Sequence, residues 1–569
     1  MRRYLFLTLL LLSFSAYGEE EEEVAVIEEA LPRLPSAPEQ KRSATFIREL
    51  KGIVLVGDPE HILEGDQLKE AQGIEFSNIK VPGNAKTLRR RLSAFLGHKV
   101  DQDTLGEIKE VITSYYQQAS HPLVLVEIPQ QDISESVIQV LVLGSRLGAV
   151  KVEGNTWSSS LRLREYVDLI PNQQINESRL MKDVYFINRN PFRRVDIVYA
   201  PGEEPQTTDV ILSVRERRAW RFYAGAENTG VEPTERGRWY AGFNWGNAFC
   251  LGHILSYQFT SAFDVNRFHA HTGEYTAPLP WKHVFTVYGG YSRVKPKDLK
   301  PPIKSNEGWS MQVSARYNVP LNITQYLEHE FTVGADFKRT NNTFEFEEDF
   351  PLLGRPVNLT QLVVGYAGNY NRSSYRLDFD GDLYWSPGNL FADQSDAAYD
   401  SLRPDAKNHW VYFRGSFVYL QRLPKSFSLS LLARGQIASQ NLLPSEQFGL
   451  GGYSTVRGYD QREVNKDGAI LLSGEARSPA FRVLKNIKSQ WKVDDAMQFL
   501  IFLDYGWGSD HNALPGERKT DYLFGTGPGV RYTIEPYLTA RLDWGIKLHK
   551  KAEFGGGNTM VHFNVTASY

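Results

Sequence analysis

Few residues of this chain have the types and spacing that catalysis needs. Gly452-Tyr453-Ser454 begins like the nucleophile elbow of a hydrolase, but Val456 stands where the closing glycine is required. The sequence has no Walker A loop, no His-Glu-x-x-His pair and no dinucleotide fingerprint after a strand. The single Cys250 cannot form an intrachain disulfide or supply a multi-cysteine metal site. We therefore expect a protein that is not an enzyme and that needs no cofactor or metal.

One arginine and one aspartate remain as candidates for a specific interaction. Arg457 follows the glycine-rich run 449–455, within the segment Val456-Arg457-Gly458-Tyr459. Asp504 interrupts an otherwise apolar strand pattern. Its outer row is Phe499, Ile501, Leu503 and Tyr505, and its other row contains Phe502, Asp504 and Gly506. A carboxylate in so apolar a strand is tolerated only on the face turned away from lipid.

The elements that carry these residues are strands. Beyond Arg217 apolar and polar residues alternate, as in Leu255–Thr260, and the last nine residues alternate up to a terminal Tyr569. Aromatic residues make up 12% of the chain, and no later segment is long and apolar enough for a membrane helix. Residues 217–569 provide enough length for about sixteen strands at roughly 20 to 23 residues each. The pattern predicts a closed transmembrane β-barrel of antiparallel strands.

The N-terminus is typical of an exported protein. Residues 1–18 combine Arg2 and Arg3, the apolar stretch Tyr4–Phe14 and a small-x-small cleavage site, which together predict a signal peptide. Residues 19–49 contain the acidic run Glu19–Glu23 and three prolines, and we expect a leader and linker there.

Residues 50–216 contain a supersecondary pattern twice. In 50–145 a strand at 51–56 precedes helices at 85–96 and 104–118 and strands at 123–128 and 137–143. The second copy, 146–216, repeats this order with a strand at 147–153, helices at 159–169 and 178–187, and strands at 194–199 and 208–214. We predict two tandem α+β modules. The net charge of -3 gives no reason to expect a nucleic-acid partner.

Six short segments occur in an order that resembles one family. They are Ile128–Ile133, Asn188–Arg194, Tyr223–Gly230, Tyr275–Trp281, Val456–Tyr459 and Phe502–Gly506. Together they resemble the TpsB transporters of two-partner secretion, the haemolysin-activator branch of the POTRA-and-barrel superfamily of outer-membrane assembly factors. The resemblance covers nearly the whole mature chain. It implies two periplasmic POTRA domains, at 50–145 and 146–216, followed by a sixteen-stranded outer-membrane barrel at 217–569.

The resemblance also assigns a place to the two candidate residues. It implies that the loop with Val456, Arg457, Gly458 and Tyr459 folds back into the lumen, where Arg457 meets Asp504 on the barrel wall. The alternative is an external loop, with Asp504 paired to another lumenal base such as Arg434 or Arg541. Two departures from the family are Tyr569, where most barrels end in Phe, and extra residues at 58–78 in the first module. Family members can carry a plug helix, for which Val24–Ala30 is the candidate.

The predicted function is an outer-membrane translocation pore. It would recognise an unfolded, TpsA-like exoprotein at the edge of a POTRA sheet and secrete it through the barrel, with membrane lipid as its other partner. One alternative is an assembly factor of the same superfamily that inserts other barrels. Another is a solute porin with periplasmic adaptors. For the modules themselves, the alternative is a scaffold for partner proteins.

Overall fold

The computed structural model describes residues 46–63, 71–121, 123–204, 207–297, 307–321, 324, 326–341, 356–484, 494–513, 518–551 and 557–569. The predicted signal peptide, the acidic leader and the plug candidate lie outside these residues. The chain divides into two compact units, with the boundary between Arg217 and Arg218. Within the described ranges, no helix has the length and apolar character needed to cross a membrane.

The first module of the N-terminal unit is a four-stranded sheet with two helices. Its elements are β1 (Gly52–Val56), β2 (Gly73–Ser77), α4 (Ala85–Leu92), α5 (Gln102–Gln118), β3 (Val124–Glu127) and β4 (Val137–Gly144), and short 3-10 turns lie at Pro59–His61 and Ser93–Phe95. The strand order is β2-β1-β4-β3. Ile108 and Ile112 of α5 pack on Ile53 and Val140 of the sheet. The extra residues at 58–78 thus supply β2, which pairs in parallel with β1.

The second module is a three-stranded sheet, β5-β7-β6, with two helices. Its elements are β5 (Arg146–Glu153), α6 (Ser160–Glu165), α7 (Glu177–Asn188), β6 (Arg193–Pro201) and β7 (Thr207–Glu216). Helix α6 ends before the predicted 169, because the Asp183 carboxylate accepts a hydrogen bond from the Asp168 amide at 2.8 Å and holds the chain away from the helix. After α7 the Asn188 side chain pairs with the backbone of Val195, which turns the chain into β6.

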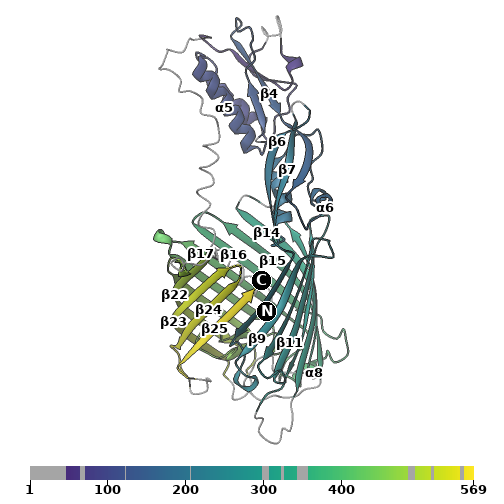
Figure 1. Ribbon diagram of the computed structural model, residues 1–569, viewed down its shortest axis with the longest axis vertical. Helices are drawn as coiled ribbons and strands as arrows, with labels where there is room; N and C mark the ends of the chain where they lie inside the picture. The colour runs from purple at the N-terminus through teal and green to yellow at the C-terminus, as the bar shows by residue number, and fades with distance from the viewer. Residues whose placement is uncertain are drawn as a thin grey trace. The chain divides into compact units, whose positions relative to one another are not determined.

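The C-terminal unit is a closed barrel of sixteen antiparallel strands, so the predicted fold class is confirmed (Figure 1). The strands are β8 (Trp220–Glu227), β9 (Arg238–Ala248), β10 (His253–Ala262), β11 (Phe268–Pro278), β12 (Val284–Val294), β13 (Gly308–Pro320), β14 (Leu327–Thr340), β15 (Val357–Asn371), β16 (Tyr375–Ser386), β17 (Trp410–Arg422), β18 (Ser428–Ala438), β21 (Gly468–Arg477), β22 (Asp494–Ser509), β23 (Thr520–Glu535), β24 (Leu538–Lys547) and β25 (Thr559–Ser568). Each strand pairs with its neighbour in sequence, and β25 closes on β8. Closure leaves no strand edge exposed to lipid.

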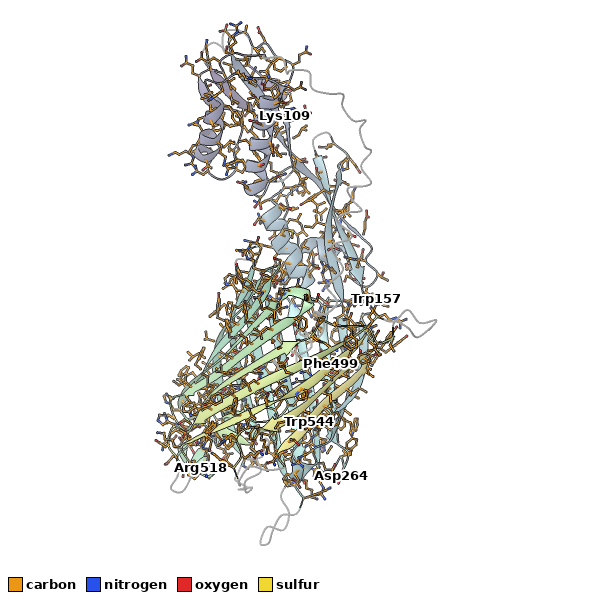
Figure 2. The ribbon with its side chains drawn as sticks, turned by 90° about the vertical axis from the view of Figure 1, so that its left-hand side faces the viewer. Lys109, Trp157, Asp264, Phe499, Arg518 and Trp544 are labelled. Carbon is orange, nitrogen blue, oxygen red and sulfur yellow. The ribbon has the colours of Figure 1, made fainter. Side chains whose placement is uncertain are left out.

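Strand alternation separates the two faces of the barrel wall. Ile501 and Leu503 are 66% and 51% exposed on the outer face, whereas Phe502 and Asp504 between them are buried. Phe499, on the same strand β22, and Trp544, on β24, also lie on the outer face of the barrel (Figure 2). The terminal Tyr569 pairs with Phe222 through two backbone hydrogen bonds, and its hydroxyl accepts a 2.7 Å hydrogen bond from Arg218. A phenylalanine could not accept that bond, so the tyrosine has a local role in the closure.

Candidate functional site: a loop held in the barrel lumen

The loop between β18 and β21 folds inward. It contains a short antiparallel hairpin of β19 (Phe448–Leu450) and β20 (Val464–Lys466). Val456 and Tyr459 are buried in a cluster with Leu471 of β21 and Leu523 of β23. Both leucines lie on barrel strands, so the loop tip is packed against the inner surface of the wall.

The Arg457 guanidinium lies directly on Asp504. Its Nε and Nη2 donate to the two carboxylate oxygens at 2.7 Å each, and the Arg457 backbone amide donates to the same group at 3.0 Å. The side chains are 3% and 0% exposed. The guanidinium also stacks on the Phe502 ring, 3.6 Å from its centre. A bidentate pair with a backbone bond and an aromatic platform fixes both the distance and the orientation of the loop.

A wider ion cluster surrounds this pair. Arg457 Nη1 donates to Glu475 at 2.6 Å and lies 3.7 Å from Asp543. Asp543 accepts from Arg531 and Arg541, at 2.7 and 2.6 Å. Arg541 therefore pairs with Asp543 rather than with Asp504. The other proposed partner, Arg434, donates to the Ser454 carbonyl at 3.3 Å.

Glycines on the barrel wall allow the loop to approach. A Cβ at Gly525 would lie 2.2 Å from the Arg457 carbonyl oxygen, and one at Gly545 would lie 2.2 Å from the Gly458 nitrogen. At Gly506, on the strand of Asp504, it would meet the Val456 side chain at 2.9 Å. These glycines form a groove across β22, β23 and β24 that receives loop backbone. Sequence reasoning placed Gly506 on this face but missed Gly525 and Gly545.

Gly458 and Tyr459 complete the attachment. Gly458 has φ +99, a conformation that disfavours any residue with a side chain. Its amide donates to His562 Nε2 of β25 at 3.0 Å. The Tyr459 hydroxyl lies 3.0 Å from the Phe524 carbonyl oxygen and accepts from the Phe524 amide at 3.2 Å. The segment 456–459 thus contacts strands from β21 to β25.

This arrangement holds a loop in place and has no reactive group. The arginines are permanently charged, and the carboxylates that surround them are bonded to guanidinium groups. Among the residues that the structure describes, no three His, Cys, Asp or Glu side chains are grouped to hold a metal ion. The geometry is that of a latch between a loop and the barrel wall.

A barrel that holds one of its own loops in the lumen, in a chain that also contains two small α+β modules, belongs to the class of POTRA-and-barrel outer-membrane transporters. Residues 206–532 match the model of the family described as haemolysin secretion/activation protein ShlB/FhaC/HecB. The chain belongs to this family.

Individual relatives are distant in sequence but similar in length and fold. The heme/hemopexin transporter protein HuxB of Haemophilus influenzae is 23% identical over 78% of this chain and 76% of its own. The outer-membrane transporter CdiB-2 of Burkholderia pseudomallei is 21% identical over 78% of this chain and 74% of its own. Among solved structures, CdiB from Escherichia coli matches with TM-score 0.73, 16% identity and coverage of 97% of this chain and 96% of that chain.

The family establishes the function at the level of class. The protein is an outer-membrane transporter of two-partner secretion, with its POTRA domains in the periplasm, and it is not an enzyme. Its partner is a secreted protein, as the family implies.

Proposed function

We propose that this transporter secretes one large exoprotein, which reaches the POTRA domains unfolded and crosses the membrane through the barrel lumen. We further propose that the loop carrying Arg457 closes the lumen at rest. The observation that carries this proposal is the buried Arg457–Asp504 pair, because it fixes the loop tip against the wall inside the channel. We retain 50–145 and 146–216 as the POTRA domains and 217–569 as the barrel.

The latch sets an energetic condition for transport. Breaking a buried ion pair by removing one partner costs about 3–5 kcal/mol, since the remaining charge stays in a poorly solvated site. Glu475 and Asp543 also lie beside Arg457, which neutralises part of their negative charge. Moving Arg457 away would therefore leave these two carboxylates less well compensated as well. Opening the loop during transport therefore needs a compensating interaction. Binding of the client at the POTRA domains is the source we propose.

The POTRA sheets offer a suitable mode of client binding. The outer strands are β2 and β3 in the first module and β5 and β6 in the second. An unfolded segment can add to such an edge through main-chain hydrogen bonds, while its alternate side chains supply specificity. The client then needs no folded epitope, and its folding outside the cell can drive export without a nucleotide.

The test compares culture supernatants and outer-membrane proteomes of four strains: intact gene, deletion, Arg457→Ala, and Arg482→Ala as the control. Arg482 is half-exposed and pairs only loosely with Asp494, at 3.4 Å. We expect the deletion to remove one large protein from the medium while other barrels stay at normal levels. Arg457→Ala should change the amount of that same protein and of no other, because the loop that closes the lumen is then no longer fixed to the wall. General depletion of barrels in the deletion strain would instead support an assembly factor, and no change in either fraction would refute secretion.

A further inference from the structure

The turn between β15 and β16 carries an arginine on the outer face of the barrel. The chain enters the barrel at β8 from the periplasmic domains and neighbouring strands are antiparallel, so β15 ends and β16 begins at the periplasmic end. On β15, Leu362, Val364 and Tyr366 are exposed on the outer face. Tyr370 continues this row, because every second residue of a strand faces the same side. Arg372 follows at the next position of the row.

Tyrosines hold the Arg372 side chain on that face. Its Nε donates to the Tyr370 hydroxyl at 2.9 Å, and its guanidinium stacks on the Tyr326 ring, 3.4 Å from the ring centre. Its backbone amide donates to the Tyr375 carbonyl oxygen at 2.8 Å, which closes the turn. These contacts fix the plane of the guanidinium. They leave Nη1 and Nη2 for another acceptor, because no hydrogen bond or ion pair joins them to any residue that the structure describes.

The tyrosines form a continuous row along the periplasmic edge of the barrel. The ring centres of Tyr326 and Tyr370 are 6.4 Å apart, those of Tyr370 and Tyr375 6.0 Å, and those of Tyr375 and Tyr419 5.8 Å. The row runs from the start of β14 across to β17. Such aromatic girdles lie at the level of the lipid headgroups. Arg372 therefore lies where the hydrocarbon of the membrane ends and its phosphate groups begin.

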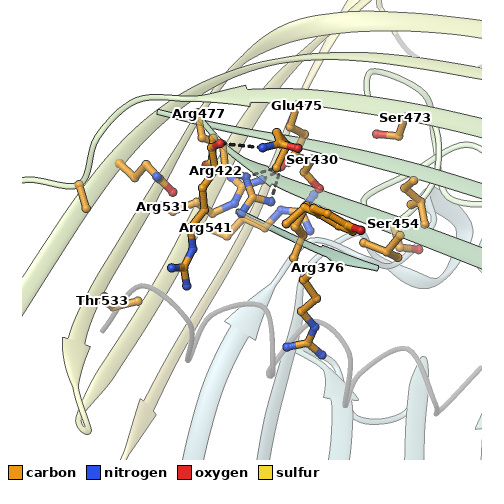
Figure 3. Close-up of a pocket in the computed structure, with 18 of the residues that line it drawn as sticks. Arg376, Arg422, Ser430, Ser454, Ser473, Glu475, Arg477, Arg531, Thr533 and Arg541 are labelled. Carbon is orange, nitrogen blue, oxygen red and sulfur yellow. Dashed lines mark hydrogen bonds and ion pairs between the residues drawn. The ribbon is translucent and has the colours of Figure 1, made fainter. Parts of the chain in front are cut away.

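The protein does not neutralise this arginine. The acidic residues at the periplasmic end of β14 to β17 alternate with outward-facing rings such as Phe331, and so face the lumen; they are Glu328, Glu330, Asp378 and Asp380. Asp378 pairs at 3.0 Å with Arg376, which lines the lumenal cavity (Figure 3). The outer face around Arg372 thus has a cation and no carboxylate.

A phosphodiester fits this combination. The planar guanidinium binds phosphate oxygens through paired N–H donors, and basic sites at a membrane surface bind anionic headgroups. The exposed Ser373 and Ser374 of the same turn add hydroxyl donors. A zwitterionic headgroup would bring an ammonium group for which this surface has no carboxylate. A lipid whose headgroup carries only negative charge is therefore favoured.

We propose that Arg372 and the tyrosines around it bind the phosphate group of an anionic phospholipid in the periplasmic leaflet of the outer membrane. Tyr326 and Tyr370 orient the guanidinium, and its Nη groups donate to the phosphate oxygens. The acyl chains lie along the outer face, where Phe331 and Phe417 are exposed. In the strand order, β15 and β16 are the strands farthest from the junction of β25 and β8. The site is independent of the latch and of the identity of the client.

Native mass spectrometry of the purified full chain in detergent tests the binding. The probes are phosphatidylglycerol, phosphatidylethanolamine and glycerol 3-phosphate, which has the phosphate but no acyl chains. The test variant is Arg372→Gln. The control is Arg482→Gln, which removes the same charge from a half-exposed arginine that has a carboxylate partner, Asp494, at 3.4 Å.

Wild type and control should retain phosphatidylglycerol in preference to phosphatidylethanolamine. Affinity for phosphatidylglycerol should fall about tenfold or more in Arg372→Gln, because a hydrogen-bonded contact to a charged group is lost. Equal retention by the three proteins, or no preference between the two lipids, would overturn the proposal. Binding of glycerol 3-phosphate as tight as that of the lipid would mean that the site takes free phosphate compounds, and would also overturn it.

Thermal unfolding in vesicles tests the same site in a bilayer. A ligand that binds only the folded protein raises its unfolding temperature. Wild type and control should unfold at a higher temperature in vesicles of phosphatidylethanolamine with phosphatidylglycerol than in phosphatidylethanolamine alone. This difference should shrink in Arg372→Gln and in Arg372→Lys, since lysine keeps the charge but lacks the planar fork. An undiminished difference in Arg372→Gln would refute the site, and one in Arg372→Lys alone would refute the role of the oriented guanidinium.

Discussion

At the scale of single residues, the latch depends on the glycines of the barrel wall as much as on Arg457. We predict that Gly545→Ala displaces the loop, because its Cβ would lie 2.2 Å from the Gly458 nitrogen and 2.5 Å from the Gly458 Cα. Overpacking of this kind costs about 1–3 kcal/mol, and each 1.4 kcal/mol changes an equilibrium tenfold. Single-channel recordings should show more frequent openings than in wild type.

The matched control is Gly435→Ala in β18. There a Cβ would meet no atom closer than 3.6 Å, an ordinary contact. Its recordings should resemble those of wild type. If Gly545→Ala also behaves as wild type, the close contact between loop and wall does not control opening.

A second prediction at this scale concerns Glu216, at the end of β7. Its carboxylate accepts hydrogen bonds from the amides of Thr156, Trp157 and Ser158, at 2.6, 2.5 and 3.0 Å. Burial raises the pKa of Glu216, but the hydrogen bonds from Ser158, Trp157 and Thr156 outweigh it and lower this pKa below the ordinary glutamate value. Glu216→Gln should therefore accelerate amide exchange at 156–158 at neutral pH.

The pH dependence of that effect has a definite sign. A carboxylate with a lowered folded-state pKa contributes stability above its unfolded pKa of about 4.3, and this contribution is lost as pH falls through the folded value. The exchange ratio of variant to wild type, measured by mass spectrometry, should thus decrease toward one in acid. Glu203→Gln, at an exposed position, is the control. A ratio independent of pH would mean that the negative charge of Glu216 is not what protects these amides.

At the scale of elements, the segment between β16 and β17 is a second structure anchored to the inward loop. Tyr399 and Leu402, in and after α8 (Asp396–Asp400), pack on Leu442 and Leu443 of the inward loop. Arg403 donates to the Leu442 carbonyl at 2.6 Å and pairs with Asp467 and Asp510. The buried carboxylates make Arg403 the main anchor of the segment.

Arg403→Gln should release this segment. Loss of one partner from a buried ion pair costs about 3–5 kcal/mol, so amide exchange in α8 should accelerate by about a hundredfold or more. The control is Lys407→Gln, whose pair with Asp396 is 3.8 Å long and about half-exposed, and such pairs contribute little. Equal exchange in both variants would show that apolar packing alone holds the segment.

The elements also show how far the sequence could predict the site. Alternation in the strand around Asp504 identified its face, and the order of six motifs identified the family and the pairing with Arg457. Glu475 and Asp543 also alternate with apolar residues, so a lumenal position was readable for them. Their contact with Arg457 could not be predicted, because it depends on the register between neighbouring strands, in which Ser473 lies opposite Asp504. If the register of one strand shifts by two residues, each side chain stays on the same face of the sheet, but the residue opposite it changes.

At the scale of the whole molecule, the barrel is closed by a short seam. Strands β25 and β8 pair over five positions, from Asn564–Glu227 to Ser568–Tyr223, and Tyr569, just beyond β25, adds a sixth with Phe222. By contrast, β22 and β23 pair over sixteen positions. A substrate that left the barrel sideways would have to open this seam. A client that passes through the lumen would leave it closed.

Cross-linking the seam separates these two routes. Ala224 and Ala567 face each other across it, and both are exposed on the outer face. Paired antiparallel residues have Cα atoms about 4.5–5.5 Å apart, within the range that a disulfide spans. We predict that Ala224→Cys/Ala567→Cys, in a Cys250→Ala background, secretes the exoprotein equally well when oxidised or reduced. Ala315→Cys/Ala335→Cys, an outward-facing pair within the wall, is the matched control. If oxidation stops secretion only in the seam variant and reductant restores it, transport requires the barrel to open laterally, and the lumen is not the complete path.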